Sequence, residues 1–223
     1  KMIDQAFSRD LAADAEFSVS SSRGRGYGSI IPANVNLAAA EIELIGVDRK
    51  EFILKNEVDY VYDRYDYIII DCPPSLNMLT INSMTTADSI LVPIQCEYYA
   101  LEGLSQLIHT VNLVKERLNP NLVMEGVVFT MFDSRTNLST QVVENVKSNL
   151  NGYIFETVIP RNIRLAEAPS YGMPIIKYDP KSTGSDAYMS LAEELLSKYE
   201  PRPKEEEKPE EEKKDDKKGD KKK

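Results

Sequence analysis

The residues with the clearest potential for chemistry surround one carboxylate, Asp71, in the stretch YDYIIIDCPPSLNMLT at residues 65–80. Three isoleucines lead directly into this aspartate, and Pro73 and Pro74 follow it. If the apolar run is a buried strand, Asp71 lies at the rim of a sheet, where a carboxylate can hold a hard cation directly or through its water shell. The alternative is that Asp71 caps the turn or helix that follows, as aspartate does at many strand ends.

The elements that would position this carboxylate alternate along the chain. Apolar runs of strand length alternate with segments of helical period from about Gly28 onward. The stretches DYIIID, DSILVPIQC, MEGVVFTMF and YIFETVIP read as strands, and GSIIPA is a further candidate. The stretches NLAAAEIELIG, ALEGLSQLIHTVNLVKERLN, NLSTQVVENVKSNL and GSDAYMSLAEELLSKY read as helices. In the second of these, one apolar stripe comprises Leu101, Leu104, Ile108, Val111 and Leu118.

This alternation predicts an α/β fold with a mostly parallel sheet covered by helices on both faces, because the strands are continuously apolar rather than alternating. Ligands of such sheets bind outside the carboxyl ends of the strands, which is where Asp71 would lie. An apolar strand that ends in a metal-holding aspartate is the Walker B arrangement of nucleotide hydrolases.

Composition sets the limits of the domain. The segment 201–223 carries ten Lys/Arg and nine Asp/Glu without a large apolar residue, so we expect it to be disordered. The remaining residues 1–200 have a net charge of −10, so a nucleic-acid contact must be a local basic patch. Cys72 and Cys96 lack metal-ligand spacing and are expected to be small buried side chains in a reduced, cytoplasmic setting. No apolar run reaches the ~18 residues that span a bilayer.

Several of these stretches together resemble the ParA/Soj family of chromosome- and plasmid-partitioning ATPases, which belong to the deviant-Walker P-loop class and are related to MinD. The resemblance covers roughly residues 29–199 and rests on IIIDCPPS, on FTMFDSRTNLSTQVVENV and on VIPRNIRLAEAPSYGMPIIKYDPKSTGSDAYMSLAEELL. It implies three parts: a divergent segment at 1–28, a ParA-like α/β domain at 29–200 and the charged tail at 201–223.

The resemblance also implies roles for individual residues. Asp71 matches the Walker B carboxylate that holds Mg²⁺ through a water, and Pro160, Arg161 and Asn162 match the loop along the nucleotide base. Arg135 and Arg164 match arginines that contact DNA without sequence preference. From the residues alone, these arginines could equally be solvent-facing or pair with Asp133 and Glu167. The implied cofactors are ATP and Mg²⁺, and the implied partners are non-specific DNA, a ParB-like protein and a second copy of the chain in an ATP-dependent dimer at the nucleoid.

One feature of the family is missing from the sequence. A nucleotide hydrolase of this class needs a glycine-rich loop that ends in Gly-Lys-Ser/Thr, because backbone amides and a lysine must offset the triphosphate charge. The only glycine cluster before Asp71 is RGRGYGS at 23–29, which contains no lysine. Walker A lysines are therefore absent, no catalytic residue is assigned, and we expect little activity from this chain alone.

Three functions remain open at this point. The chain is either part of a ParA-type partitioning ATPase, whether a truncated fragment or a natural remnant, or a DNA- or partner-binding protein that does not hydrolyse ATP. A MinD-like membrane cycle is less favoured, because the Glu/Lys-rich tail has no apolar face for a membrane-binding helix.

Overall fold

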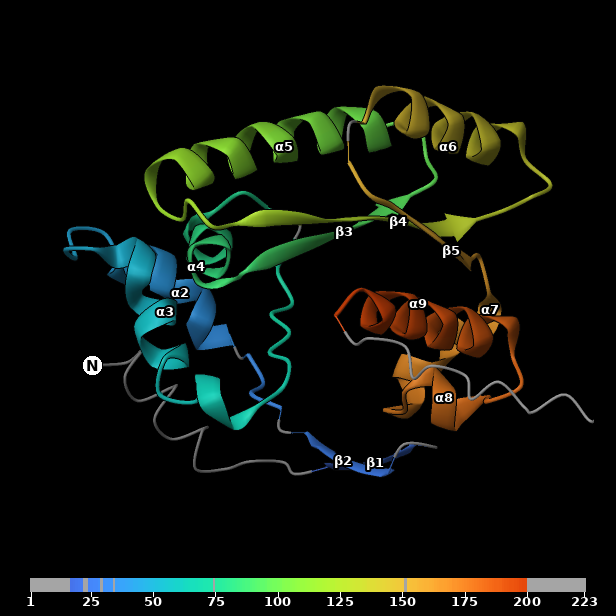
Figure 1. Cartoon of the computed structure of the whole chain (residues 1–223), viewed down its shortest axis with the longest axis horizontal. Coiled ribbons are helices and arrows are strands. Elements are labelled where there is room, and N and C mark those ends of the chain that lie inside the picture. Colours follow the sequence, from blue (N-terminus) through green and yellow to red (C-terminus); the bar gives the residue numbers. More distant parts are fainter. Residues whose placement is uncertain are drawn as a thin grey trace, which may run out of the picture.

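The computed structural model describes residues 17–21, 24–28, 30–33, 35–73, 75–150 and 152–199, so the tail expected at 201–223 lies outside the described residues. A three-stranded parallel sheet lies at its centre, in the order β3-β4-β5 (Figure 1). Its strands are β3 (Ser89–Gln95), β4 (Val123–Phe132) and β5 (Ile154–Pro160). The expected α/β class and the strands after residue 88 are therefore confirmed.

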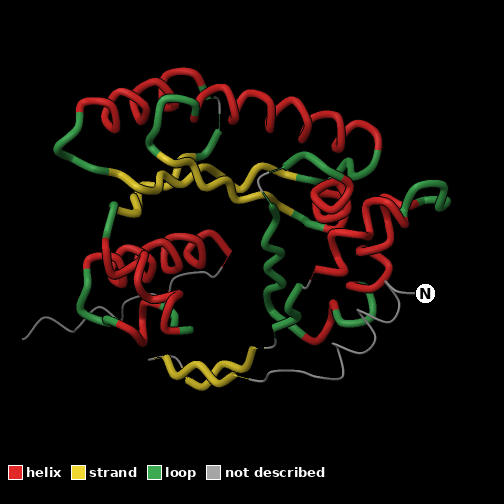
Figure 2. Tube along the Cα trace, turned by 180° about the vertical axis from the view of Figure 1, so that it is seen from behind, coloured by secondary structure: helices red, strands yellow, loops and turns green. Residues whose placement is uncertain are grey.

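Helices cover both faces of this sheet. The helices α5 (Ala100–Arg117) and α6 (Asn137–Asn149) lie over one face, and α9 (Thr183–Tyr199) lies over the opposite face with α7 (Ile163–Glu167), η3 (Ala168–Tyr171) and α8 (Ile175–Tyr178) (Figures 1 and 2). Each parallel strand reaches the next through a helical crossover, as parallel pairing requires. The two covered faces differ in how much of the sheet they protect.

The face under α5 and α6 holds the largest core. Val92 and Ile94 of β3 pack with Phe129 of β4, and Leu104 of α5 is buried against them. The apolar stripe expected on α5 lies on the helix face that packs against this core, because residues three and four apart share one helix face. Phe129 is 0% exposed and is among the largest fully buried side chains.

The opposite face is covered over β4 and β5 but not over β3. Val128, Phe155 and Ile159 are buried there against apolar side chains of α7 and α9. On β3 the matching positions remain open: Leu91 is 37% exposed, and Pro93 is exposed as well.

The C-terminal end of α9 is fixed by a buried carboxylate. Glu125, 5% exposed, accepts hydrogen bonds from Lys198 Nζ and Tyr199 Oη. The Lys198 ammonium also lies 4.0 Å from the Tyr153 ring centroid and 5.3 Å from that of Phe155. Burial alone would raise the pKa of Glu125, but the hydrogen bonds from Lys198 and Tyr199 outweigh it and lower the pKa. The buried charge is thereby compensated.

A group of short helices lies beside the start of β3 (Figure 1). It comprises α2 (Val35–Glu43), η1 (Lys50–Phe52), α3 (Ile53–Val58), η2 (Tyr62–Arg64) and α4 (Met78–Thr86). Asn82 of α4 joins this group, because its amide donates to Lys50 O at 2.9 Å and accepts from Leu54 N at 3.1 Å. Gly46, at φ 84, ends the turn after α2.

The glycine cluster RGRGYGS contributes a strand rather than a phosphate-binding loop. Residues 24–28 form β2 (Gly24–Gly28), which pairs antiparallel with β1 (Phe17–Ser21) in a separate two-stranded sheet. The strand suggested for GSIIPA is wrong for residues 30–33, which have no regular structure. Ile30 and Ile31 are 54% and 44% exposed there, so no core holds this apolar pair in a strand.

The strand expected at DYIIID is also wrong. Residues 65–73 contain neither helix nor strand, and they run from η2 toward the sheet without joining it (Figures 1 and 2). Ile68 is 39% exposed and Ile69 is 90% exposed. A strand needs a neighbour for its backbone hydrogen bonds, and in the described part of the chain β3 pairs only with β4.

The free side of β3, which we call the outer edge, is interrupted by a proline. Cys96 N donates to Thr130 O at 3.0 Å, so alternation along the strand turns the backbone groups of Val92 and Ile94 toward β4. Leu91, Pro93 and Gln95 then direct their backbone groups to the outer edge. Pro93 lacks an N–H, so its missing donor falls on the side where β3 has no described partner.

Candidate functional site

The carboxyl ends of the three strands form one edge of the sheet, which we call the carboxyl rim. Pro160, the last residue of β5, lies opposite Phe132, the last residue of β4. Arg161 N continues the pairing by donating to Phe132 O at 2.9 Å. The loop after β4, which carries Asp133 and Arg135, and the loop after β5 therefore lie side by side.

The loop after β4 presents one guanidinium bound to one carboxylate. Arg135 Nε and Nη2 donate to the two oxygens of Asp133 at 2.8 and 2.7 Å, and Arg135 N donates to Oδ1 at 3.0 Å. The hydrogen bonds from Arg135 and the nearby charge of Arg161 lower the pKa of Asp133 to about 2. The Arg135 side chain is 85% exposed and that of Asp133 is 16% exposed, so the cation faces solvent over a shielded anion.

The loop after β5 begins the short helix α7 and joins it to α9. Asn162 caps α7, because its Oδ1 accepts from Arg164 N at 2.7 Å, and its Nδ2 donates to Thr183 Oγ1 at 2.8 Å. Arg164 lies between two carboxylates, with Nη1 2.9 Å from Glu167 Oε2 and Nε 3.4 Å from Asp179 Oδ2. The ion pairs with Asp133 and Glu167 that the sequence left open are both formed.

Sequence reasoning missed two supports of this second cluster. Tyr178 Oη donates to Glu167 Oε2 at 3.1 Å, and the Tyr178 ring stacks on Tyr171 with centroids 5.0 Å apart. The contact of Arg164 with Asp179 could not be predicted from the sequence. The two residues are fifteen positions apart and meet only because of the way the segment between α7 and α8 folds. Asp133 was visible because it lies two positions from Arg135.

One strained backbone position lies near the end of β4. Met131 has φ 54, one of two described non-glycine residues with a positive φ. The pairing of β4 with β5 changes register between Phe129 and Phe132, on either side of this residue. Side chains tolerate this conformation poorly, and it is found more often where a strand end must be redirected toward a site. At this position it precedes the Asp133 loop.

The structure brings Pro160, Arg161, Asn162, Arg135 and Arg164 to the carboxyl rim but leaves Asp71 in the segment 65–73. Asp71 is exposed, and no hydrogen bond or ion pair joins it to those five residues. Cys72, expected to be buried, is exposed because it shares this segment, whereas Cys96 is buried as expected.

The side chains present do not by themselves fit a complete magnesium–triphosphate site. Within the described ranges, no three His, Cys, Asp or Glu side chains gather closely enough to hold a metal ion. Asp71 could supply one oxygen ligand, which suffices for Mg²⁺ only when phosphates and waters provide the others. Nothing in the sequence provides the Gly-Lys-Ser/Thr loop that would hold those phosphates.

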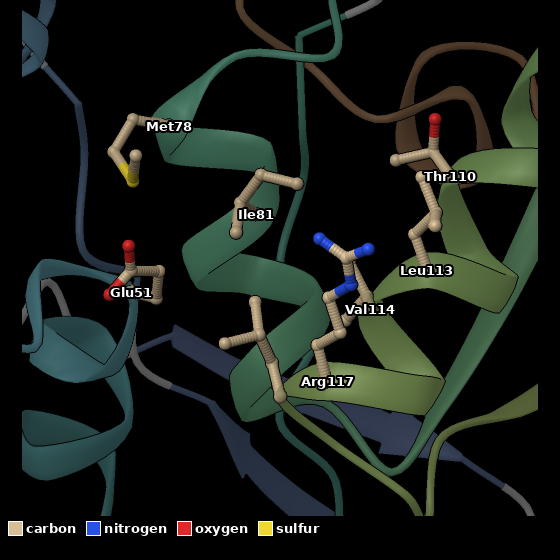
Figure 3. Close-up of a pocket in the computed structure, with 8 residues that line it drawn as sticks. Glu51, Met78, Ile81, Thr110, Leu113, Val114 and Arg117 are labelled. Carbon is tan, nitrogen blue, oxygen red and sulfur yellow. The ribbon is translucent and has the colours of Figure 1, made fainter.

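One groove lies away from the rim. Its volume is about 260 Å³, and it is lined by side chains of η1, α4 and the second half of α5 (Figure 3). The floor is apolar, with Glu51 and Arg117 as the charged residues of its lining. Arg117 ends α5, which leads into the start of β4, so this groove lies toward the opposite edge of the sheet and does not extend the candidate site.

No helix in the described ranges is both long enough and apolar enough to span a membrane.

Two curated proteins are similar to most of this chain. The chromosome partitioning protein ParA of Myxococcus xanthus is 53% identical over 176 residues, which cover 79% of this chain and 62% of that protein. The sporulation initiation inhibitor protein Soj of Bacillus subtilis is 57% identical over 168 residues, which cover 75% of this chain and 66% of that protein. The chain thus spans less than two thirds of the length of these relatives.

A solved structure and a protein family agree with these similarities. Cobyrinic acid a,c-diamide synthase from Mycobacterium smegmatis, crystallised with an ATP analogue and magnesium, superposes with a TM-score of 0.68 at 31% identity, covering 87% of this chain and 71% of that one. The AAA_31 family, described as an AAA domain, matches residues 12–124. The chain therefore belongs to this AAA-domain family, and its relatives there are ParA/Soj partitioning ATPases.

Proposed function

We propose that this chain carries the nucleic-acid-binding part of a ParA/Soj-type partitioning protein, which binds DNA without sequence preference and dimerises in a nucleotide-dependent cycle. The observation that carries this proposal is the pairing of Arg161 N with Phe132 O, which sets the Arg135 loop beside the loop of Arg161 and Arg164. Three guanidinium groups lie together at this rim, those of Arg135 and Arg161 on adjacent loops and that of Arg164 on α7, and they are the groups that would make the phosphate contacts.

For the nucleotide, we propose that the chain supplies only part of the site. Asp71 would hold Mg²⁺ through a water, and the loop of Pro160, Arg161 and Asn162 would lie along the base. The bound ATP analogue and magnesium in the Mycobacterium smegmatis neighbour support a nucleotide site in this fold. Lacking a phosphate-binding lysine loop, the 223-residue chain is expected to bind Mg-ATP weakly or not at all.

The DNA assignment is tested with a double variant, Arg135→Ala with Arg164→Ala, in filter binding to unrelated duplexes. We expect the wild-type chain to bind all of them alike, with steep salt dependence, and the double variant to lose binding. Arg117→Ala is a control for the loss of an arginine outside the patch, because it removes one arginine at the opposite edge of the sheet. Unchanged binding by the double variant would refute the assignment.

The nucleotide assignment is tested by calorimetry of the purified chain with Mg-ATP. Tight binding that requires Mg²⁺ would contradict the expected weakness. If such binding occurred and Asp71→Asn removed it, Asp71 would be the metal-holding residue of a site complete in this chain.

A binding protein without ATP turnover is the second candidate. It is favoured by the exposed position of Asp71 outside the sheet, since a carboxylate on an irregular segment is positioned less precisely for phosphoryl transfer than one at the end of a strand. The two candidates differ in one measurement: only the first predicts that adding Mg-ATP changes the DNA binding of this chain. A ParB-like partner would then act on either.

A further inference from the structure

We propose that the carboxylates beside the rim arginines, Asp133 above all, act as built-in competitors of phosphate and set the affinity of the basic patch. This inference rests on the proposed DNA binding and deepens it. The contacts between these carboxylates and the rim arginines keep the basic patch close to neutral.

The first observation is the geometry at Asp133. Its two oxygens take the Nε and Nη2 donors of Arg135 at 2.8 and 2.7 Å, which is the two-point arrangement that a phosphate group would occupy on the same guanidinium. A phosphate must therefore either displace this carboxylate or bind only the outer N–H groups. Either route weakens the contact.

The second observation is the charge balance. Arg135, Arg161 and Arg164 contribute three positive charges, and each nearby acid offsets one of them. Asp133 contacts Arg135 and lies within electrostatic reach of Arg161, while Glu167 and Asp179 both contact Arg164. The patch is thus close to neutral while these pairs are formed, within a chain whose net charge is −9.

The third observation separates the two arginines. The Arg135 side chain is 85% exposed and has one carboxylate partner, whereas that of Arg164 is 52% exposed, has two, and shares Glu167 with the Tyr178 hydroxyl. Releasing Arg164 would disturb α7 and α8, but releasing Arg135 disturbs only a loop. Asp133 is therefore the competitor that can be removed without loss of structure.

The test is Asp133→Asn in the 223-residue chain. Asparagine keeps the oxygen that accepts from Arg135 N and removes the negative charge. We expect duplex DNA to bind about three- to tenfold more tightly, with a salt slope steeper by about 0.9 as one more phosphate is neutralised. Asp59→Asn, an exposed aspartate in the turn after α3, changes net charge equally and should leave both values unchanged.

Two further measurements make the outcome decisive. Adding Arg135→Gln to Asp133→Asn should cancel the gain, because the released guanidinium is then absent. Tripolyphosphate binding, measured on the same variants, reports on the arginine without DNA. Equal or weaker binding of both ligands by Asp133→Asn overturns the inference, whereas a gain for tripolyphosphate with no DNA binding by any variant supports it and refutes the proposed DNA function.

Discussion

The two faces of β3 differ in how well helices cover them. On one face, Val92 and Ile94 are buried under α5 and belong to the core around Phe129. On the other face, Leu91 and Pro93 are exposed, and the segment 65–73 has no regular structure and is mostly exposed. One face of β3 is thus packed and the other is uncovered. An apolar segment forms a strand only where backbone partners and a covering layer are both present.

The largest expected effect is on the packed side. Phe129→Ala should lower the free energy of unfolding by about 3–5 kcal/mol, because it removes a fully buried ring and leaves a cavity. Ile69→Ala, at a side chain that is 90% exposed, should change it by no more than about 0.5 kcal/mol. Urea denaturation of both variants measures the contrast. A cost for Ile69→Ala approaching that of Phe129→Ala would mean that the segment 65–73 is packed in solution.

A smaller effect is expected at the anchor of α9. Lys198→Met leaves Glu125 buried without its cationic partner, so we expect the free energy of unfolding to fall by about 2–3 kcal/mol. Combining Lys198→Met with Glu125→Gln removes both charges and should restore part of the loss. Calorimetric unfolding at pH 7 measures this coupling, and additive losses in the double variant would argue against a coupled pair.

The smallest effect is a pH dependence at the carboxyl rim. The pKa of Asp133 is lowered from 3.8 to about 2, so its ion pair stabilises the folded state above about pH 4, and this stabilisation is lost as the pH falls toward 2. A carbon-detected NMR titration of the Asp133 carboxyl should have its midpoint near 2. In Arg135→Gln the midpoint should return toward 3.8, and a midpoint that does not move would show that Arg135 is not the cause.

Much of the fold could be predicted from the sequence because local pattern and tertiary packing agree there. The run SILVPI became β3, and the stripe through Leu104 and Val111 marked the buried face of α5. The hydrophobic pattern of the sequence is sufficient to predict a strand wherever that strand has a neighbour in the described sheet.

The remaining features depended on partners that the pattern does not contain. The isoleucines before Asp71 are strand-like by composition, but no described strand bonds to them, and the segment stays irregular. The Arg135–Asp133 pair was one of two open alternatives, since exposed charges two residues apart either pair or remain solvated. The Arg164–Asp179 contact required the turn between α7 and α8, which no sequence spacing indicated.

The proline at the centre of the outer edge of β3 has a consequence for self-association. Another extended chain laid along that border would meet amide donors at Leu91 and Gln95 with a gap between them. The hydrogen-bond ladder along the outer edge would be interrupted at Pro93, which disfavours open-ended stacking of identical copies through this edge. A short strand could still bind there if its side chains covered the exposed apolar surface of β3. Pro93 alone thus disfavours polymerisation through the edge of β3 that has no described partner.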